Sequence, residues 1–379
     1  MLTNCILFSI MSKNYYIIFL FLCLTFVSCS KDEDDEYIEI PALETPVSVN
    51  LVNVPYTKLS EYHFFKDEIK NHIPTTGVLP YEPASSLFSD YSHKIRFVWL
   101  PSGTSATYNG DNNVFEFPIG TALIKTFYYD NVLPDNVRKI IETRLLVRKS
   151  DGWKAYDYIW NTEQTDAFLD TEEQGVFIPV EWNENGITRS ITYKTPSQTE
   201  CITCHKINPN QTVGGEITIP IGPKPQNLNT DFNYSTGVQN QITKWKSMGY
   251  LGNDIPSSIY SAVNWTDVSK SLEQRAKSYI DINCAHCHRT GGHCDYVNMR
   301  FEYSNTDMNS FGVCMTPLFH IENGPFVINS GDADHSELIH RINTNEGATM
   351  MPIIGRTIIH DEGVQLIRDW INSLPDDCH

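Results

Sequence analysis

Between residues 95 and 195, short apolar runs alternate with turn sequences. The runs are rich in β-branched and aromatic residues, which pack well on a pleated surface and favour strands. Turn sequences such as Asn109-Gly110-Asp111 and Asp151-Gly152 separate them. This pattern predicts an N-terminal antiparallel β-rich domain, either a sandwich or a barrel. The expected strands are residues 95–100, 114–117, 122–129, 140–148, 153–160, 176–182 and 187–193.

From about residue 266, the apolar positions instead recur at helical spacing. Asp267 stands where the N-cap of the first helix is expected, and Pro375 closes the last one. The intervening segment 196–265 is rich in Pro, Gly and Asn. We therefore expect an α+β chain in which an all-α domain follows the β-rich half. The expected helices are residues 238–248, 267–283, 336–343 and 361–374.

The N-terminus has the pattern of a targeting segment, a signal peptide over residues 1–28. An apolar run at 15–27 is too short for a comfortable membrane span, and it ends at Ser28-Cys29, which resembles a bacterial lipoprotein cleavage site with Cys29 as the lipidated residue. The acidic residues that follow predict a solvated tether over 29–56 and resemble the surface-export signals of some Gram-negative lipoproteins. We expect an outer membrane lipoprotein, on the periplasmic or the cell-surface face. An uncleaved anchor helix is the alternative.

The net charge restricts the partners of this chain. Asp and Glu number 46 against 28 Lys and Arg, which gives a formal charge of -18. Because phosphate binding needs a positive field, nucleic acid is not an expected partner. The acidic surface is a solvated face that could also steer a basic redox partner.

Two pentapeptides share the form Cys-x-x-Cys-His: Cys201-Ile202-Thr203-Cys204-His205 and Cys284-Ala285-His286-Cys287-His288. Two thiols three positions apart can add to the two vinyl groups of one haem, and the adjacent histidine then lies under the iron as an axial ligand. Composition alone would supply roughly 0.01 such pentapeptides in a chain of this length. The pattern therefore predicts two covalently bound c-type haems, attached at Cys201, Cys204, Cys284 and Cys287, with His205 and His288 on the irons.

Other chemistries also use pairs of cysteines. A Cys₄ zinc site would take both pairs, whereas a disulfide or a thioredoxin-like redox site would form within each pair. Neither requires the histidine that follows each pair, and 80 positions (284 − 204) separate Cys204 from Cys284. An exported chain also faces an oxidising compartment. Covalent haem therefore accounts best for both motifs.

The order of elements in the C-terminal part carries a resemblance. A helix runs into Cys284, Met351-Pro352 follows, and an amphipathic helix ends the chain. This order over residues 266–379 resembles the class I cytochrome c fold, in which a methionine sulfur binds the far face of the haem. The resemblance implies Met351 as the ligand opposite His288, an arrangement that raises the reduction potential. A residue before proline is pushed out of helical geometry, which favours Met351, whereas core filling is the expectation for Met350.

The first motif is less complete, because no Met-Pro sequence follows His205. Met248 is the only methionine between the two motifs. Met248, a histidine of the β half such as His93, or an open position all remain as the sixth ligand of the first iron. An open iron could perform chemistry, whereas a six-coordinate iron mainly passes electrons.

The remaining cysteines have structural interpretations. Cys294 and Cys314 lie within the second haem domain, and we expect a disulfide between them that contributes about 3 kcal/mol on the chain-entropy model. Cys378 is left without a partner. His286, inside the second motif, is expected to face solvent.

Beyond its motifs, the chain resembles a family of extracytoplasmic dihaem c-type cytochromes over residues 57–375. The resemblance implies dihaem electron transfer outside the cytoplasm and transfers the six haem-binding residues to Cys201, Cys204, His205, Cys284, Cys287 and His288. It also implies a redox partner, which in this family is often thought to be a parallel β-helix protein. The segments that carry it include 87–91, 96–101, 117–121, 141–147, 152–153, 160–161, 220–224, 283–288, 312–314, 351–352 and 355–356.

The main hypothesis is a membrane-anchored dihaem electron carrier. A haem enzyme of the peroxidase type, with an open first iron, is one alternative. A β-rich module that binds a glycan or a partner and carries the haems as a redox appendage is another. The expected domains are a signal peptide (1–28), an acidic tether (29–56), a β-rich domain (57–195), a first haem-binding segment (196–265) and a cytochrome c-like domain with the second haem (266–379).

Overall fold

The computed structural model describes residues 44–172, 174–320 and 324–378. All of them belong to one unit of the chain, residues 43–379. The expected signal peptide, Cys29 and the first part of the expected tether lie outside the described residues. Within the described part of the chain, no helix is both long enough and apolar enough to cross a membrane.

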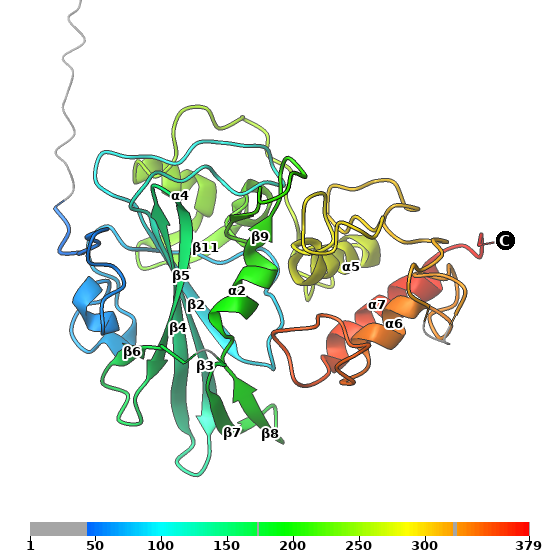
Figure 1. Ribbon diagram of the computed structural model, residues 1–379, viewed down its shortest axis with the longest axis horizontal. Coiled ribbons are helices and arrows are strands. Elements are labelled where there is room, and N and C mark those ends of the chain that lie inside the picture. Colours follow the sequence, from blue (N-terminus) through cyan, green and yellow to red (C-terminus); the bar gives the residue numbers. More distant parts are fainter. Residues whose placement is uncertain (1–43, 173, 321–323, 379) are drawn as a thin grey trace, which may run out of the picture. The chain divides into compact units, whose positions relative to one another are not determined.

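The N-terminal half forms an eight-stranded antiparallel sheet, which confirms the predicted β-rich half (Figure 1). Strand β3 pairs with β2, β4 and, near its end, β7, which also pairs with β8. The edge strands β1 and β6 do not pair with each other, so the sheet does not close into a barrel. All eight strands belong to one sheet, so the expected sandwich or barrel is corrected to an open sheet with β7 and β8 as a two-stranded branch. The strands are β1 (Leu79–Pro80), β2 (His93–Trp99), β3 (Ala122–Val132), β4 (Val137–Lys149), β5 (Gly152–Trp160), β6 (Ala167–Leu169), β7 (Phe177–Glu184) and β8 (Ile187–Lys194).

Side-chain alternation gives the sheet two different faces. On one face Phe97, Ile124 and Leu145 pair across β2, β3 and β4, and they share an apolar core with Tyr62 and Phe64 of the segment before the sheet. On the other face, Val98, Leu123 and Leu146 form part of a second apolar core. Helix α4 (Gln241–Ser247) contributes the buried Trp245 to this second core. The short 3-10 helices η1 (Leu59–Tyr62) and η2 (Ile69–Asn71) precede the sheet.

Helix α2 (Gln198–His205) follows the last strand of the sheet and contacts β5. Short elements then lead to the C-terminal part. They are β9 (Lys206–Ile207), β10 (Ile217–Thr218), α3 (Pro225–Leu228), β11 (Asp231–Tyr234) and β12 (Gly237–Asn240). The helix expected over 238–248 is shorter in the structure, because residues 237–240 pair in a hairpin before α4 begins.

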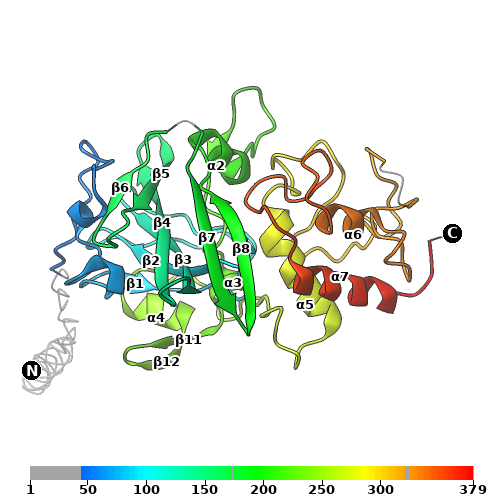
Figure 2. The ribbon, with the colours of Figure 1, turned by 90° about the horizontal axis from the view of Figure 1, so that it is seen from below.

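The C-terminal helices pack around an apolar core, beside the sheet in both ribbon views (Figures 1 and 2). Helix α5 (Leu272–Ile280) continues as a π-helix, η3 (Asp281–Ala285), and its N-cap is Ser271 rather than Asp267. Helices α6 (Glu337–Ile342) and α7 (Asp361–Ser373) match two expected helices closely. The apolar stripe of α7 packs against α5, as its periodicity predicts. Between residues 286 and 336 the described chain has neither helices nor named strands.

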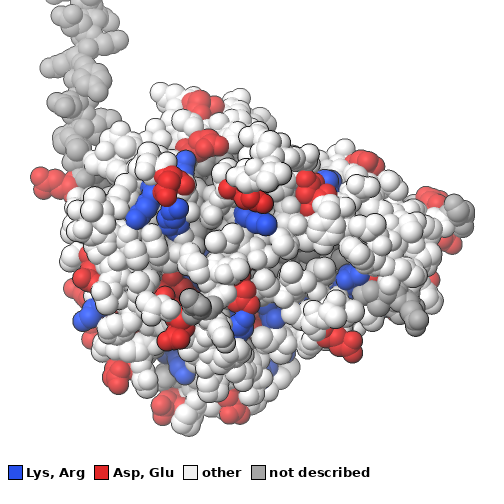
Figure 3. Space-filling model, in the orientation of Figure 1, with Lys and Arg blue, Asp and Glu red and all other residues white. Residues whose placement is uncertain are grey.

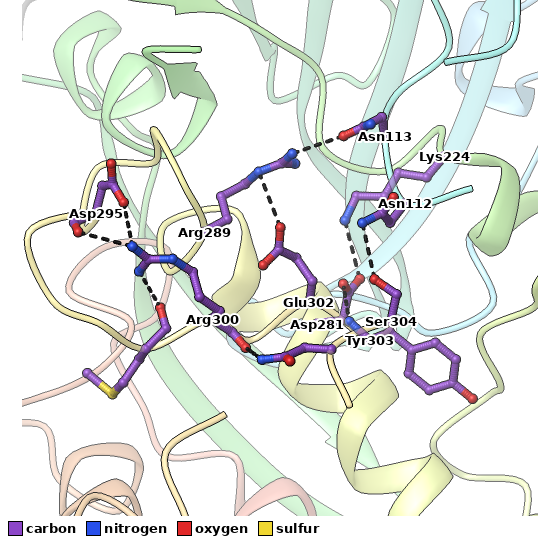
Figure 4. A network of polar contacts seen from close by, with 12 residues as sticks. Asn112, Asn113, Lys224, Asp281, Arg289, Asp295, Arg300, Glu302, Tyr303 and Ser304 are labelled. Carbon is purple, nitrogen blue, oxygen red and sulfur yellow. Dashed lines mark hydrogen bonds and ion pairs between the residues drawn. The ribbon is translucent and has the colours of Figure 1, made fainter. Parts of the chain in front are cut away.

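Polar contacts join the C-terminal part to the β half. The carboxylate of Asp90 accepts hydrogen bonds from the backbone N–H groups of Thr357 (2.6 Å) and Ile358 (3.0 Å). Figure 4 shows a second group of contacts, in which Arg289 donates to Asn113 (3.0 Å) and Asn112 donates to Ser304 (3.1 Å). These contacts hold the segments around the second Cys-x-x-Cys-His motif against the sheet-bearing half.

The disulfide of the C-terminal part differs from the expected one. Cys314 is bonded to Cys378, not to Cys294, so the predicted Cys294–Cys314 disulfide is wrong. The chain after α7 turns back past Ser330, whose backbone N–H lies 3.3 Å from the Cys378 sulfur, and this return brings Cys378 to Cys314. Cys294 is a free, buried thiol, and its backbone N–H donates to the carbonyl of Cys287 in the second motif (3.0 Å).

Candidate functional site

The first motif lies on α2, which is fixed at its start by a capping box. The Ser197 hydroxyl accepts from the Glu200 backbone N–H (3.3 Å), and the Glu200 carboxylate accepts from the Ser197 N–H (2.8 Å). Gln198 donates to the Ala155 carbonyl of β5 (3.2 Å). The helix therefore begins at a defined point on the sheet, and Cys201, Cys204 and His205 follow within its last turns.

The side chain of His205 is oriented by a backbone acceptor. Its Nδ1–H donates to the Ile219 carbonyl (2.8 Å), and the Ile219 N–H donates back to the His205 carbonyl (2.6 Å). Burial lowers the pKa of His205 to about 4, so the imidazole is neutral at pH 7. A neutral imidazole with its proton on Nδ1 presents the Nε2 lone pair to a metal, which is the arrangement that most histidine ligands adopt.

The second motif begins in the π-helix at the end of α5. Its carbonyl at Cys284 accepts from the backbone N–H groups of Cys287 (3.1 Å) and His288 (3.0 Å), so the motif closes as a tight turn. Two buried side chains hold this region in place. Asn283 accepts from the Phe88 N–H (2.8 Å), and Asp281 accepts from the Tyr303 N–H (3.0 Å) and pairs with Lys224 (3.4 Å). π-Helical turns are rare and often occur at functional sites.

A cavity of about 410 Å³ lies against the second motif. Cys284, Cys287 and His288 line it together with Met351, whereas Met350 does not. His288 is 9% exposed, and burial lowers its pKa to about 4, so it is also neutral at pH 7. The two residues expected to bind the second iron thus share one cavity. Most of its other lining side chains are apolar: Val297, Met299, Phe301, Leu318, Phe319, Val327, Leu338, Ile342, Pro352, Ile353 and Ile354.

Two arginines position the loop that carries Met351. The Met351 N–H donates to the Arg341 carbonyl (2.8 Å), and the Met351 carbonyl accepts from Arg356 (3.0 Å and 3.1 Å). Arg356 is 6% exposed and also donates to the Thr344 carbonyl (2.8 Å). The backbone of Met351 is thus hydrogen-bonded through both its N–H and its carbonyl, and its side chain lines the cavity.

The fold brings the two motifs into contact. Ligand atoms of Cys204, His286 and Cys287 all lie within 4.8 Å of one another. Interaction with Cys287 and then with His286 lowers the pKa of Cys204 to about 4, and Cys204 and Cys294 together raise the pKa of Cys287. His286 therefore lies against the first motif, which corrects the expectation that it faces solvent.

The segments that follow the two motifs also meet. The Asn208 N–H donates to the Gly291 carbonyl (2.7 Å). Gly291 has a φ of +74°, and a Cβ at this position would lie 2.5 Å from the Asn208 carbonyl oxygen. Glycine is thus required for the close approach.

The structure does not bring either named sixth-ligand candidate to the first motif. Met248 packs with the apolar core around Trp245. His93 is exposed, and strand alternation places it on the opposite face of the sheet from Lys94 and Lys125. His205 interacts electrostatically with Lys125, so His93 and His205 lie on opposite sides of the sheet.

Sequence reasoning missed a group of charged residues on the sheet face beside the first motif. These residues lie on one face of three neighbouring strands, and the other positions on that face include buried apolar residues. They are Lys94, Arg96, Lys125 and Arg144. The sequence could have revealed them, because in three successive strands a Lys or Arg occupies a position that the two-residue period assigns to the same face as buried apolar residues.

No protein-family model, no curated protein and no solved structure matches the chain.

Proposed function

We propose that this chain is a dihaem c-type cytochrome that transfers electrons outside the cytoplasm. The observation that carries the proposal is the contact between the two Cys-x-x-Cys-His motifs, whose residues Cys204 and Cys287 meet although they are 83 positions apart (287 − 204). Electron transfer between two haems requires redox centres that lie close together, and this contact would place them so; one metal ion shared by Cys204, His286 and Cys287 is the alternative that the experiment below tests.

The residues present fit covalent haem at both motifs. Each motif offers two thiols, and each histidine is neutral at pH 7 because burial lowers its pKa to about 4. At the second motif, one apolar cavity is lined by both a histidine and a methionine. Bound haem would supply reversible one-electron chemistry at iron. The polypeptide would orient the ring through His205 and His288, exclude water with the apolar lining, and hold the two attachment sites side by side.

The proposal extends to the fold of the C-terminal part. Helix α5, the second motif, Met351-Pro352 and helix α7 follow one another in the order of a class I cytochrome c domain, and α5 and α7 pack together. We infer a cytochrome c-like domain from this order. His288 and Met351 would then hold the iron of the second haem.

The cell location and partners belong to the same proposal. The leader and Cys29 support an outer membrane lipoprotein, on the periplasmic or the cell-surface face. The formal charge of -18 favours redox partners with basic patches, and a parallel β-helix protein is one candidate partner. Acidic side chains are scattered over the face in Figure 3 rather than gathered in one patch, so steering by net charge is favoured over a single acidic docking site on that face.

One observation favours a second candidate function. Neither Met248 nor His93 is placed to bind opposite His205. An open position at the first iron would give a haem enzyme of the peroxidase type rather than a simple carrier.

The test is to produce the full chain with the haem-attachment machinery and to measure haem content, mass and spin state. Two haems per chain, both lost stepwise in Cys201→Ala/Cys204→Ala and Cys284→Ala/Cys287→Ala, are expected. Cys294→Ala is the matched control, because this neighbouring thiol lies outside both motifs. A high-spin signal from one haem, with turnover of peroxide, favours the enzyme. Colourless protein that contains zinc bound by Cys204, His286 and Cys287 overturns the proposal.

A further inference from the structure

A row of cations crosses the sheet on one face. In the register of the strands, Arg96 of β2 lies opposite Lys125 of β3, and Lys125 lies opposite Arg144 of β4. Lys94 lies two positions from Arg96 and therefore points to the same face. We call Lys94, Arg96, Lys125 and Arg144 the basic row.

Four carboxylates act electrostatically on the basic row: Glu82 acts on Arg96, Asp90 acts on Lys94, and Glu142 and Asp157 act on Arg144. Arg144 pairs with Glu142, which is fully buried and also accepts from the Tyr193 hydroxyl. Burial opposes ionisation of Glu142, but Arg144 holds its pKa below the usual value. Asp157 is the other carboxylate that acts on Arg144, and burial followed by the charge of Glu142 raises its pKa well above the usual value. Of these two carboxylates, Glu142 is thus the one that stays ionised beside the four cations.

Two members of the row have no polar partner among the described residues. No hydrogen bond or ion pair is formed there by the side chains of Arg96 and Lys125, and Arg96 is only 6% exposed. Lys125 lies over the Phe127 ring at 4.6 Å. Burial, followed by the charge of Arg96, lowers the pKa of Lys94 and of Lys125 well below the usual lysine value. The Arg96 guanidinium is thus buried without a hydrogen bond, although the charge of Glu82 acts on it, and a bound anion would offset the cost of burying it.

The row faces the first motif. Arg144, Asp157 and Glu142 act electrostatically on Cys201, and Lys125 acts on His205. Helix α2, which carries both residues, contacts β5 next to the row. An anion on the row would therefore lie beside Cys201 and His205.

We propose that the basic row is a carboxylate-binding site beside the first motif. Arginine binds carboxylates through two parallel hydrogen bonds, and lysine adds a point charge, so the combination of Arg96 and Lys125 suits this ligand class. Two sources share the chemistry: the propionates of a haem at the first motif, which rests on the proposed function, and a free small carboxylate.

The experiment uses the full chain and succinate as the probe. Lys125→Met and Arg96→Met remove charge from the row, and Lys154→Met is the control on the same sheet, since Lys154 is paired with Asp151 at the start of β5. Succinate binding is measured by calorimetry on protein with both haems and on the Cys201→Ala/Cys204→Ala variant, which lacks the first attachment site.

If the propionates occupy the row, succinate binds only to the variant that lacks the first haem, and Lys125→Met lowers the midpoint potential of the first haem, because loss of a nearby cation stabilises oxidised iron. If the ligand is a free carboxylate, succinate binds to the haem-loaded protein and Lys125→Met weakens it about tenfold. A chain that carries no haem still tests the row, because succinate binding is then read directly. Two results together would overturn the proposal. Succinate would bind to every form of the protein no more tightly than to Lys125→Met and Arg96→Met, and Lys125→Met would leave the midpoint potential of the first haem unchanged. Because Lys125 is only partly buried, Lys125→Met keeps the test informative if Arg96→Met does not fold.

Discussion

The sulfur atoms of Cys204 and Cys287 lie within 4.8 Å of each other, on different elements of the chain. Cys204 comes from helix α2 beside the sheet, and Cys287 comes from the turn that follows the π-helix. The contact depends on the meeting of two loops, where Asn208 bonds to Gly291 (2.7 Å). Haems attached at the two motifs would therefore lie on adjacent sites.

Substitution of Gly291 by Ala should separate the two motifs. The new Cβ would lie 2.5 Å from the Asn208 carbonyl oxygen, so the two loops must move apart. We expect a loss of unfolding free energy larger than the backbone cost of about 1–2 kcal/mol at a positive φ, measured by urea denaturation.

Gly249→Ala is the matched control for this substitution. Gly249 has nearly the same φ, +73°, but a Cβ there would meet no atom within 4 Å. The difference between the two variants isolates the clash. Equal losses in both would show that the Asn208 contact does not constrain the loops.

Substitution of Met351 by His should lower the midpoint potential of the haem that we propose at the second motif. Methionine opposite histidine raises the reduction potential relative to a pair of histidines, and Met351 lines the cavity with His288. Spectroelectrochemistry on the haem-loaded protein measures the shift. Met350→Leu serves as the control, because Met350 does not line the cavity. A shift of equal size in Met350→Leu would contradict the assignment of Met351.

Removal of the Cys314–Cys378 disulfide should destabilise the protein. The two cysteines are 64 positions apart, and the chain-entropy model gives about 4 kcal/mol for a loop of this length. Cys378→Ser should therefore lower the denaturation midpoint. Peptide mapping under non-reducing conditions gives an independent check. A peptide pair that joins Cys294 to Cys314 would refute the observed pairing.

Protonation of His72 should contribute to acid destabilisation. His72 is 7% exposed, and burial lowers its pKa from the ordinary 6.5 to about 4. A histidine whose folded-state pKa is lowered contributes stability that is present above pH 6.5 and is lost as the pH falls toward 4, up to about 3 kcal/mol. Urea denaturation between pH 7.5 and pH 4 measures this loss.

His72→Gln should flatten that pH dependence. A glutamine amide at this position could still bond to Thr126, which lies 3.2 Å from the His72 Nε2, but it cannot be protonated. His63→Asn is the control, since His63 is exposed and its left-handed backbone suits Asn. If His72→Gln and the wild type lose the same stability on acidification, other groups are responsible.

The local pattern of apolar and polar residues was sufficient to predict the main strands and three of the helices. Strand alternation marked the main strands, and the apolar stripes marked α5, α6 and α7, because the burial of one face is a property of each element alone. The errors arose where an element depends on its neighbours. Residues 238–240 form a hairpin strand because Asp231–Tyr234 is available to pair with them, and Ser271, not Asp267, caps α5 because its hydroxyl reaches the Gln274 N–H.

The candidate site divides in the same way. The spacing of Cys201, Cys204 and His205, and of Cys284, Cys287 and His288, is a local property of the chain and could be read directly. The choice of Met351 over Met350 followed from the proline after it, and it stays a prediction; in the structure Met351 lines the cavity with His288. The disulfide partner of Cys314 could not be predicted from the sequence, because nothing near a cysteine in the sequence indicates its partner. The path of the chain past Ser330 brings Cys378 to Cys314.

The two Cys-x-x-Cys-His motifs and the main strands and helices could be predicted from the amino-acid sequence alone, since each depends on positions a few residues apart. The contact between the two motifs, and the alignment of Arg96, Lys125 and Arg144 in one row, are visible only in the folded chain. Their separation along the chain is large, and the backbone pairing of the sheet and loops, rather than any local preference, brings them together.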